Sequence, residues 1–474
     1  MKFGKPYHLV KELIVVSRRH FLKTFALTGT GAVLAGCSQR VDSDALVFRG
    51  WPYEPDLVLQ NVTRFERDYH VDVNYAAVAG EYRNKMAAMF IAGTPVDCCY
   101  VRDDDFAGWV QAGWLRPIHD LPGALDYRAT IFPFNWEAMT YNEKLYGLPY
   151  YTDFTIWVYN ERLLGEAGFD RCGETLDEIT EQAIRIKGKK IRSLDGRTIE
   201  YPIAFPFKQT AVSFNDWWAL NYASEVDLFS NDLEPTFPDD TGHRAERIMQ
   251  WLVDGIHKHH IIHPESISID GNQLRDNYMG TGQQAFCSIN KYDLERLNNR
   301  KDSAIAHDDL KRRGSPDEQL HSKICKMALY PSLEKGQRGT LGWTRMYSLT
   351  AACRPEQVEH AWQLIQFLGG KDREGNYGTA KWWFRERGLG FGHIPLLDDA
   401  DVIAQTTKWG DIDLIREQIK SVKARECIKA PWYPEFETFH QAEIQRILLK
   451  EISPRDGLAR IAKHATKLRQ EWAT

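Results

Sequence analysis

Aromatic rings and polar groups recur together near the ends of short β-rich runs, often beside Gly or Pro, as at Trp51 and Trp343. Flat rings cover the apolar C–H faces of a sugar, and carboxylates, amides and guanidinium groups saturate its hydroxyls. The candidate ligand contacts that share this setting are Trp51, Tyr53, Glu54, Asp103, Asp104, Tyr151, Asp153, Trp217, Trp218, Asn290, Tyr292, Trp343, Arg345 and Trp383. The 15 Trp residues exceed the needs of an ordinary core, which favours the same carbohydrate-binding interpretation.

Carboxylate pairs keep an enzymatic alternative open. Asp103 with Asp153, or Glu54 with Asp105, could serve as general acid and base in a secreted carbohydrate-active enzyme. A binding cleft also uses carboxylates, so these pairs do not discriminate. The chain has no GxSxG elbow, P-loop or strand-anchored GxGxxG, so we expect no cofactor and no catalytic residue. An acidic cleft would also suit a polyamine or another cation, and a sensor-linked or adhesion module is a further alternative.

Neither histidines nor cysteines predict a metal site. His259 and His263 could ligate zinc if they shared a helix, but the run precedes Pro264 and no HExxH occurs. We predict a helix end with exposed histidines there. The seven cysteines after Cys37 form no CxxC, and adjacent Cys98 and Cys99 lie in an apolar strand, which predicts buried thiols.

The elements that position the candidate contacts alternate between strands and helices. We predict strands over 45–49, 71–75 and 96–101 and helices over 54–69, 82–92 and 106–112, in units of roughly 30 residues, which is typical of parallel βαβ topology. The acids Asp103 to Asp105 would then supply one cap for the helix near Phe106 and one cleft contact. Residues 155–159 form a β-rich crossing. Helices follow over 176–187 (Thr175 as N-cap in a capping box with Glu178), 214–223, 243–257, 357–368 and twice within 439–472, with a solvated connection over 300–323.

The first 36 residues read as an export signal. They contain six basic residues and one acid, and the apolar run 24–36 is shorter than the ~20 residues of a membrane span. Arg18 and Arg19 resemble the paired arginines of the twin-arginine export route. Leu34 to Cys37 resembles a lipobox, in which signal cleavage leaves an acylated Cys37 as the new first residue. The overall charge of −5 therefore divides into +5 for the leader and −10 for the body, whose lack of a basic surplus argues against nucleic-acid binding.

In order and spacing, the body resembles ABC-transporter extracellular solute-binding proteins of the sugar-binding group, relatives of maltose-binding protein. The resemblance covers about Ala45 to Trp472. The pieces that carry it are 92–97 (Ala-Gly-Thr-Pro-Val-Asp), 113–118 (Gly-Trp-Leu-Arg-Pro-Ile), 145–150 (Leu-Tyr-Gly-Leu-Pro-Tyr), 158–164, 175–179, 278–286, 361–364 and 452–458. The run Arg102 to Asp105 departs from the family, which has a single acid there.

The resemblance implies an α/β, type II periplasmic-binding-protein-like fold with two lobes, a hinge and a central cleft. By analogy, residues 1–36 are the signal peptide and 37–43 a lipid tether. The N-lobe comprises 44–153 and 340–370, and the C-lobe 154–339 and 371–474. We expect a monomer anchored by lipid on Cys37 to a bacterial membrane, in the periplasm or at the cell surface. It would bind an oligosaccharide by hinge closure and deliver it to ABC permease subunits and their ATPase.

Overall fold

The computed structural model describes residues 44–210 and 214–473. The predicted export signal, with Arg18 and Arg19, and the predicted lipidation site Cys37 lie outside these residues. The assignment of the remaining chain to two lobes stays a prediction.

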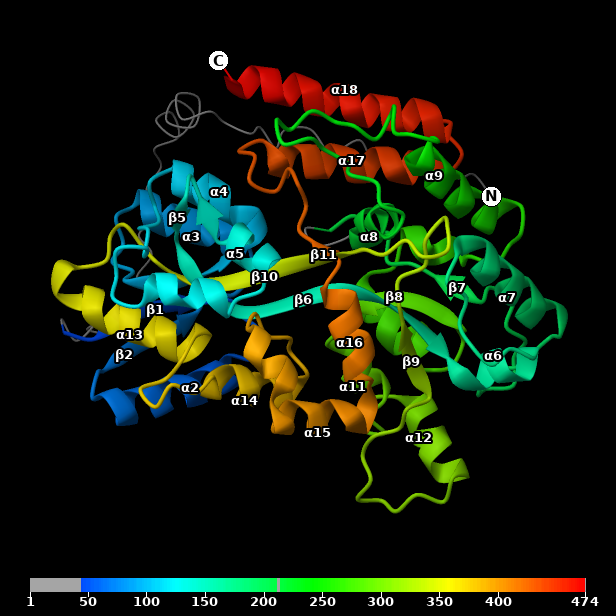
Figure 1. Cartoon of the computed structure of the whole chain (residues 1–474), viewed down its shortest axis with the longest axis horizontal. Coiled ribbons are helices and arrows are strands. Elements are labelled where there is room, and N and C mark those ends of the chain that lie inside the picture. The colour runs from blue at the N-terminus through cyan, green and yellow to red at the C-terminus, as the bar shows by residue number, and fades with distance from the viewer. Residues whose placement is uncertain (1–43, 211–213, 474) are drawn as a thin grey trace, which may run out of the picture. The chain divides into compact units, whose positions relative to one another are not determined.

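A nine-stranded sheet organises the described chain (Figure 1). Its strands run in the order β2-β1-β3-β10-β6-β8-β7, while β11 pairs with β10 and β9 pairs with β6. Pairing is parallel within β2-β1-β3 and β7-β8, and antiparallel where β10 and β6 meet β3, β8 and each other. The strands are β1 Leu46–Gly50, β2 Val73–Ala77, β3 Cys98–Arg102, β6 Gly147–Asn160, β7 Ile203–Ala204, β8 Phe286–Asn290, β9 Cys325–Ala328, β10 Thr340–Leu349 and β11 Val422–Lys423, and a separate hairpin joins β4 Thr140–Tyr141 to β5 Lys144–Leu145.

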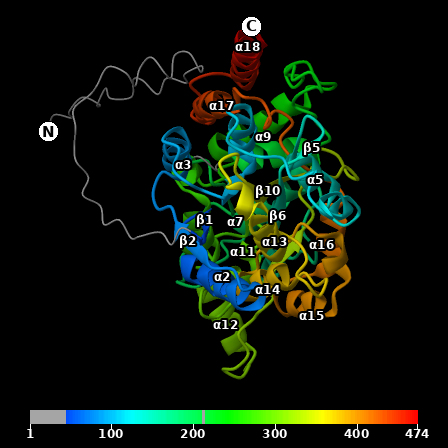
Figure 2. The same cartoon turned by 90° about the vertical axis from the view of Figure 1, so that its left-hand side faces the viewer.

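Helices cover the sheet. They are α2 Pro55–Tyr69, α3 Tyr82–Ile91, α4 Asp103–Gln111, α5 Pro133–Ala138, α6 Glu161–Ala167, α7 Leu176–Gly188, α8 Asn215–Ala223, α9 Arg244–His257, α10 Gly271–Gln273, α11 Asp293–Leu297, α12 Ala304–Arg312, α13 Val358–Gly369, α14 Gly378–Arg387, α15 Ala400–Trp409, α16 Ile412–Ile419, α17 Tyr433–Leu448 and α18 Pro454–Ala473. Figures 1 and 2 show α17 and α18 on the opposite side of the sheet from α14 and α15. Among the described residues no helix is long and apolar enough to cross a membrane.

Two hydrophobic cores lie along the sheet, and the long strands β6 and β10 contribute to both. From β6, Phe154 joins the first core and Trp157 the second; from β10, Met346 joins the first and Leu341 the second. Every residue of β10 is buried, which fits its place between β3 and β6 with helices packed over it. The sheet is therefore continuous between the two cores.

Apolar spacing explains the helices that the sequence predicts. In α2, Pro55 occupies the first turn, and Val58, Val62 and Phe65 recur on the buried face. The predicted helices 357–368 and 243–257 are confirmed as α13 and α9 within one residue. The pair predicted within 439–472 is also confirmed, but its first helix, α17, already begins at Tyr433.

The cap predicted for α7 is present in part. The Thr175 side chain accepts a hydrogen bond from the backbone N–H of Glu178 at 3.2 Å. The reciprocal half of the capping box is wrong, since the Glu178 carboxylate accepts from the N–H of Glu174 at 2.6 Å. Arg171 also binds Glu178 at 3.0 Å, and the carboxylate lies where both groups can reach it.

Two other local predictions need correction. The segment 300–323 is more than a solvated connection, because it contains α12, whose Ile305, Ala306 and Leu310 are buried. The helix predicted from Phe106 begins at Asp103, so the three acids form its first turn and Arg102 takes the N-cap position. Asp103 nevertheless accepts the N–H of Asp104 at 3.0 Å, which satisfies one first-turn donor.

The histidine run ends α9 as predicted, but of its four histidines only His260 is exposed and the others are half-buried. The helix stops at His257, and His263 lies beyond the turn, where its Nδ1 accepts the N–H of Glu265 at 3.2 Å. His259 and His263 therefore share no helix, which removes the geometric basis of the zinc alternative. No cluster suited to a metal ion occurs in the described part of the chain. Cys98 and Cys99 are free and buried, as expected.

Candidate functional site

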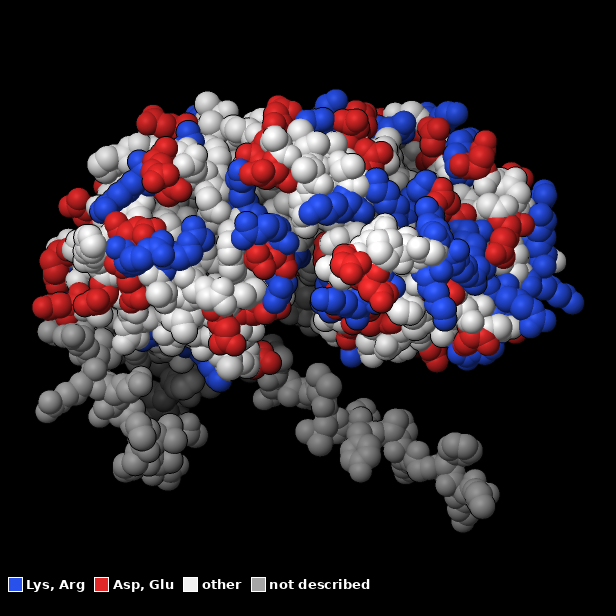
Figure 3. All heavy atoms as spheres, turned by 90° about the horizontal axis from the view of Figure 1, so that it is seen from below, with Lys and Arg blue, Asp and Glu red and all other residues white. Residues whose placement is uncertain are grey.

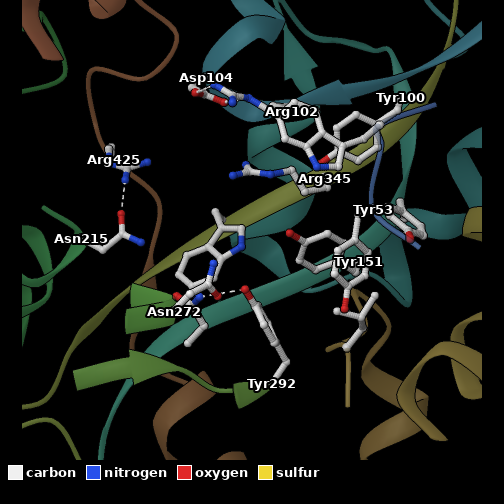
Figure 4. Close-up of a pocket in the computed structure, with 15 residues that line it drawn as sticks. Tyr53, Tyr100, Arg102, Asp104, Tyr151, Asn215, Asn272, Tyr292, Arg345 and Arg425 are labelled. Carbon is white, nitrogen blue, oxygen red and sulfur yellow. Dashed lines mark hydrogen bonds and ion pairs between the residues drawn. The ribbon is translucent and has the colours of Figure 1, made fainter. Parts of the chain in front are cut away.

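A cavity of about 300 Å³ opens where the ends of β1, β3 and β8 meet the middle of β6 and β10 (Figure 4). Its volume is at the lower end of the range for small-molecule sites. The residues that line it are Trp51, Tyr53, Tyr100, Arg102, Asp104, Tyr150, Tyr151, Asn215, Asn272, Asn290, Tyr292, Trp343, Arg345, Leu389 and Arg425. Seven of these are aromatic, and the rest, apart from one leucine, carry amide or charged groups.

Strand geometry brings several of these side chains to one face. Trp343 and Arg345 are two residues apart on β10, and Tyr100 and Arg102 are two apart on β3, so each pair shares a face. The register of β6 against β10 shifts between Arg345 and Met346, which leaves Tyr150 as an extra residue. Such a bulge re-aims a side chain, and it explains how consecutive Tyr150 and Tyr151 both reach the cavity.

The aromatic rings are held in place by their neighbours. The Trp51 ring lies edge-on to Tyr82 at 5.2 Å and tilted toward Tyr100 at 5.9 Å between centroids. The Arg102 guanidinium lies 5.6 Å from the Trp51 centroid, within cation–π range. Tyr150 meets Tyr151 edge-on at 5.3 Å. Because these contacts fix the rings before any ligand binds, little side-chain entropy is lost on binding.

Buried ion pairs form one wall of the cavity. Arg102 pairs with Asp104, and Arg83 binds the same carboxylate at 3.0 Å. Burial alone would raise the pKa of Asp104, but the Arg102 and Arg83 guanidinium groups outweigh it and hold that pKa well below its usual range. Arg345 pairs with Asp103, which also accepts the backbone N–H of Thr344 at 2.9 Å. Asp104 is thus ionised, and α4 is tied to β10.

Amide groups line the side that faces these ion pairs. The Asn215 side-chain oxygen accepts a hydrogen bond from Arg425 at 2.5 Å. The Asn290 amide donates to the Tyr292 hydroxyl at 2.9 Å. A second cavity of about 320 Å³ shares Asn215, Asn272, Asn290 and Tyr292 with the first, so the two adjoin.

Eight of the fourteen predicted contacts line the cavity. They are Trp51, Tyr53, Asp104, Tyr151, Asn290, Tyr292, Trp343 and Arg345. The structure does not bring Glu54, Asp103, Asp153, Trp217, Trp218 or Trp383 to its surface. Their roles as direct contacts are corrected on the following physical grounds.

The displaced carboxylates are occupied elsewhere. Glu54 is the N-cap residue of α2 and pairs with Arg387 at 2.9 Å. Asp103 lies behind Arg345, as described above. Asp153 is fully buried and accepts the backbone N–H of Phe154 at 2.9 Å and of Tyr292 at 3.2 Å. Desolvation raises the pKa of Asp153 to about 6, against the nearby Lys291.

The displaced tryptophans belong to the cores. Trp217 and Trp218 do not occupy a loop but lie inside α8, at 0% and 2% exposure, packed edge-on at 5.2 Å. Trp383 lies in α14 at 2% exposure and supports the lining residue Tyr150 edge-on at 5.5 Å. Part of the tryptophan surplus therefore fills the interior.

Sequence reasoning missed seven lining residues: Tyr100, Arg102, Tyr150, Asn215, Asn272, Leu389 and Arg425. Tyr100 and Arg102 lie two residues apart at the end of β3, so the alternation of side chains along a strand could have identified both. Tyr150 depends on the bulge, which has no local sequence signal here. Arg425 follows β11, more than 70 residues after β10, and no motif connects it to the cavity.

The carboxylate pairs proposed for glycoside cleavage do not face the cavity together. Asp103 and Asp105 are engaged by Arg345 and Arg83, and Asp153 is enclosed. The charged groups that line the cavity are three guanidinium groups and one carboxylate, so the lining is not acidic. This charge balance counts against the polyamine alternative.

Comparison with known proteins gives one family and many similar folds. A family model described as bacterial extracellular solute-binding protein matches residues 51–278. Maltose-bound MalE3 of T. maritima superposes with a TM-score of 0.72 at 16% identity, covering 90% of this chain and 99% of that one.

Two further structures match equally widely. An ABC-transporter solute-binding protein of Thermotoga lettingae TMO bound with α-D-tagatose has a TM-score of 0.69 and 20% identity, covering 90% of this chain and 99% of that one. The GacH receptor of Streptomyces glaucescens, solved unliganded and with acarbose, has a TM-score of 0.69 and 18% identity, covering 90% of this chain and 98% of that one. The predicted α/β periplasmic-binding-protein fold is confirmed.

Proposed function

We propose that the chain is a bacterial extracellular solute-binding protein, as the match over residues 51–278 supports, and that it binds a carbohydrate for an ABC importer. The observation that carries the proposal is the aromatic lining of the cavity, with Trp51, Tyr151, Tyr292 and Trp343 beside charged and amide groups. Rings of this kind stack on sugar faces, while the amides and guanidinium groups bind hydroxyls.

An oligosaccharide suits the site better than a single sugar ring. The adjoining cavities share Asn215, Asn272 and Tyr292, and together they extend the lining from β10 to the start of α8. Of the similar structures described above, one holds maltose and another was solved with acarbose, and both ligands have more than one ring. These observations support an oligosaccharide ligand for this chain.

In the proposed cycle, the ligand binds residues from both predicted lobes and thereby favours a closed state. Trp51 and Tyr53 come from the predicted N-lobe, whereas Asn290 and Tyr292 come from the predicted C-lobe. A ligand that contacts both sets binds the closed state more tightly, and closure follows from that difference in affinity. The closed surface would then be recognised by the permease, whose ATPase drives transport.

We propose that the protein acts outside the cytoplasm, held to a bacterial membrane through lipid on Cys37 after export directed by Arg18 and Arg19. A Cys37→Ala variant should remain soluble in the fraction that releases periplasmic or surface protein, whereas the native chain should sediment with membranes and incorporate labelled palmitate. Labelled palmitate in the Cys37→Ala variant would contradict the assignment of the anchor.

A thermal-shift screen of mono- and oligosaccharides on the residue 44–474 body tests the binding proposal. A ligand at 100 times its Kd adds about 2.7 kcal/mol to stability, which a melting curve resolves. Binding should then be confirmed by calorimetry, and no sugar should be consumed. A flat response to a broad sugar panel, or turnover of a bound sugar, would contradict the proposal.

A further inference from the structure

The charge of the cavity lining differs from the charge on the face of the molecule shown in Figure 3. On the face shown in Figure 3, acidic and basic side chains are intermixed. The charged groups of the cavity lining, in contrast, are Arg102, Arg345 and Arg425 against Asp104 alone. Two of the three arginines are compensated, because Arg102 pairs with Asp104 and Arg345 pairs with Asp103 behind the wall.

Arg425 is the exception. Arg425 is 7% exposed, yet among the described residues no carboxylate lies within ion-pair distance of its guanidinium. It donates to the neutral Asn215 side chain at 2.5 Å, and its buried Nε has no hydrogen-bond partner. An unpaired buried charge is costly, so it is retained only where something offsets that cost.

The acids nearby act on Arg425 through the electrostatic field and not through a direct ion pair. Desolvation opposes the charge of Arg425, but Tyr433, Glu437 and Asp103 favour it and raise its pKa overall. Desolvation raises the pKa of Glu437 to about 7, with Asp104 adding to the effect, so this carboxyl is only partly ionised at neutral pH. Desolvation also raises the pKa of Asp105, although Arg102 and Arg83 oppose it. The buried cluster contains as many arginines as acidic residues, and none of these acids forms a direct ion pair with Arg425. Its members are Arg83, Arg102, Arg345 and Arg425 with Asp103, Asp104, Asp105 and Glu437.

We propose that the solute is an acidic carbohydrate, and that its anionic group is bound by Arg425 together with Arg345. The proposal rests on the carbohydrate function proposed above and specifies its substrate class. A guanidinium presents parallel donors that match the oxygens of a carboxylate, sulfate or phosphate ester. The anion supplies the missing partner for Arg425, while the rings of the cavity hold the sugar faces.

The placement of these groups fits such a ligand. In Figure 4 the Arg345 guanidinium points toward the side of the cavity where Arg425 and Asn215 lie, and Tyr53 lies on the opposite side. Asn215, which orients Arg425, is the first residue of α8, a helix with no side-chain cap at its N-terminus. The positive end of that helix adds to the attraction for an anion. A neutral sugar would leave Arg425 without a counter-charge.

Matched saccharides test the proposal by calorimetry. The probes are uronate oligosaccharides of two to four rings (galacturonates, mannuronates and glucuronates), their methyl esters, sulfated and phosphorylated analogues, and neutral oligosaccharides of equal length. We expect an acidic member to bind at least about tenfold more tightly than its neutral match, since a hydrogen bond to a charged group supplies roughly this factor or more. The esters separate charge from shape, and the sulfated and phosphorylated arms identify the anionic group.

Three variants assign the effect to Arg425. Arg425→Gln keeps a donor for Asn215 but removes the charge, and should weaken the acidic probe roughly 10- to 100-fold while leaving its ester unchanged. Arg425→Lys should retain part of the preference. Arg455→Gln, on the exposed surface of α18, is the matched control and should change neither affinity.

The outcomes separate the two proposals. A neutral oligosaccharide that binds as tightly as every acidic probe overturns the acidic preference and leaves the carbohydrate function standing. Binding of no saccharide at all overturns both. A ligand-free readout is also available: Arg425→Gln should change the melting temperature little, because it breaks no direct ion pair. Marked destabilisation by Arg425→Gln, not seen for Arg455→Gln, would show a structural ion pair and refute the proposal.

Discussion

The buried pair between Asp103 and Arg345 joins the first turn of α4 to the middle of β10, and its removal should destabilise the ligand-free protein. The two side chains are 1% and 10% exposed. The substitution Asp103→Asn preserves size and an acceptor oxygen for the Thr344 N–H, but leaves Arg345 without its counter-charge. Loss of one partner of a buried pair costs about 3–5 kcal/mol.

The melting temperature converts this cost into a measurement. Unfolding entropy is about 2.1 cal/mol/K per residue, so for the 431 residues from Asp44 to Thr474 it is about 0.9 kcal/mol/K. Asp103→Asn should therefore lower Tm by about 3–6 °C. Calorimetry without ligand, at pH 7.5, is the suitable assay because Arg345 also lines the cavity.

A double variant isolates the pair itself. Combined with Arg345→Met, which removes the orphaned charge, Asp103→Asn should recover most of the lost stability. The exposed pair of Asp413 and Arg416 on α16 provides the matched control, and Asp413→Asn there should leave Tm unchanged. The reasoning is refuted if Asp103→Asn shifts Tm by less than 1 °C, or if the double variant loses as much stability as both single variants added together.

Three other perturbations have definite expected results. Asp153 has a folded pKa near 6, above its ordinary 3.8, so its contribution to stability is present below pH 4 and is lost as pH rises through 6. Relative to the native protein, the unfolding free energy of Asp153→Asn should therefore gain about 3 kcal/mol between pH 4 and pH 7 in urea titrations. A constant difference would contradict this. Trp51→Ala should weaken sugar binding at least tenfold in calorimetry, whereas Trp472→Ala, at an exposed site 40% open to solvent, should not; equal effects of the two would remove Trp51 from the site. Gly339→Ala would place a Cβ 2.0 Å from the backbone oxygen of Tyr222, so Tm should fall by about 1–3 °C, and an unchanged Tm would mean that α8 shifts without cost.

Sequence patterns predicted those parts of the fold that depend on local periodicity. Apolar residues at helical spacing were sufficient for α2 and α13, and a polar residue beside a helix start was sufficient for the Thr175 cap. They did not reveal that Trp217 faces a core, because a tryptophan near a helix start has the same local signature whether it is buried or bound to ligand.

The site was predictable where a contact lies close to a strand end in sequence, as for Trp51 and Tyr292. It was not predictable where tertiary structure decides. Tyr150 reaches the cavity only through a bulge whose register is set by β10, nearly 200 residues later. The role proposed for Arg425 depends on the lack of a direct ion-pair partner among the described residues, and this lack cannot be inferred from the sequence.

The shared strands also determine how this chain can be divided. Because β6 and β10 each supply residues to both hydrophobic cores, no contiguous stretch contains a complete core with all its strands. A fragment that ends before β10 would expose the edges of β3 and β6 and lose Met346 and Tyr347 from the first core. Expression of either half alone should give insoluble protein, whereas reporters inserted at surface turns, such as the one at Gly314 after α12, leave the strands intact.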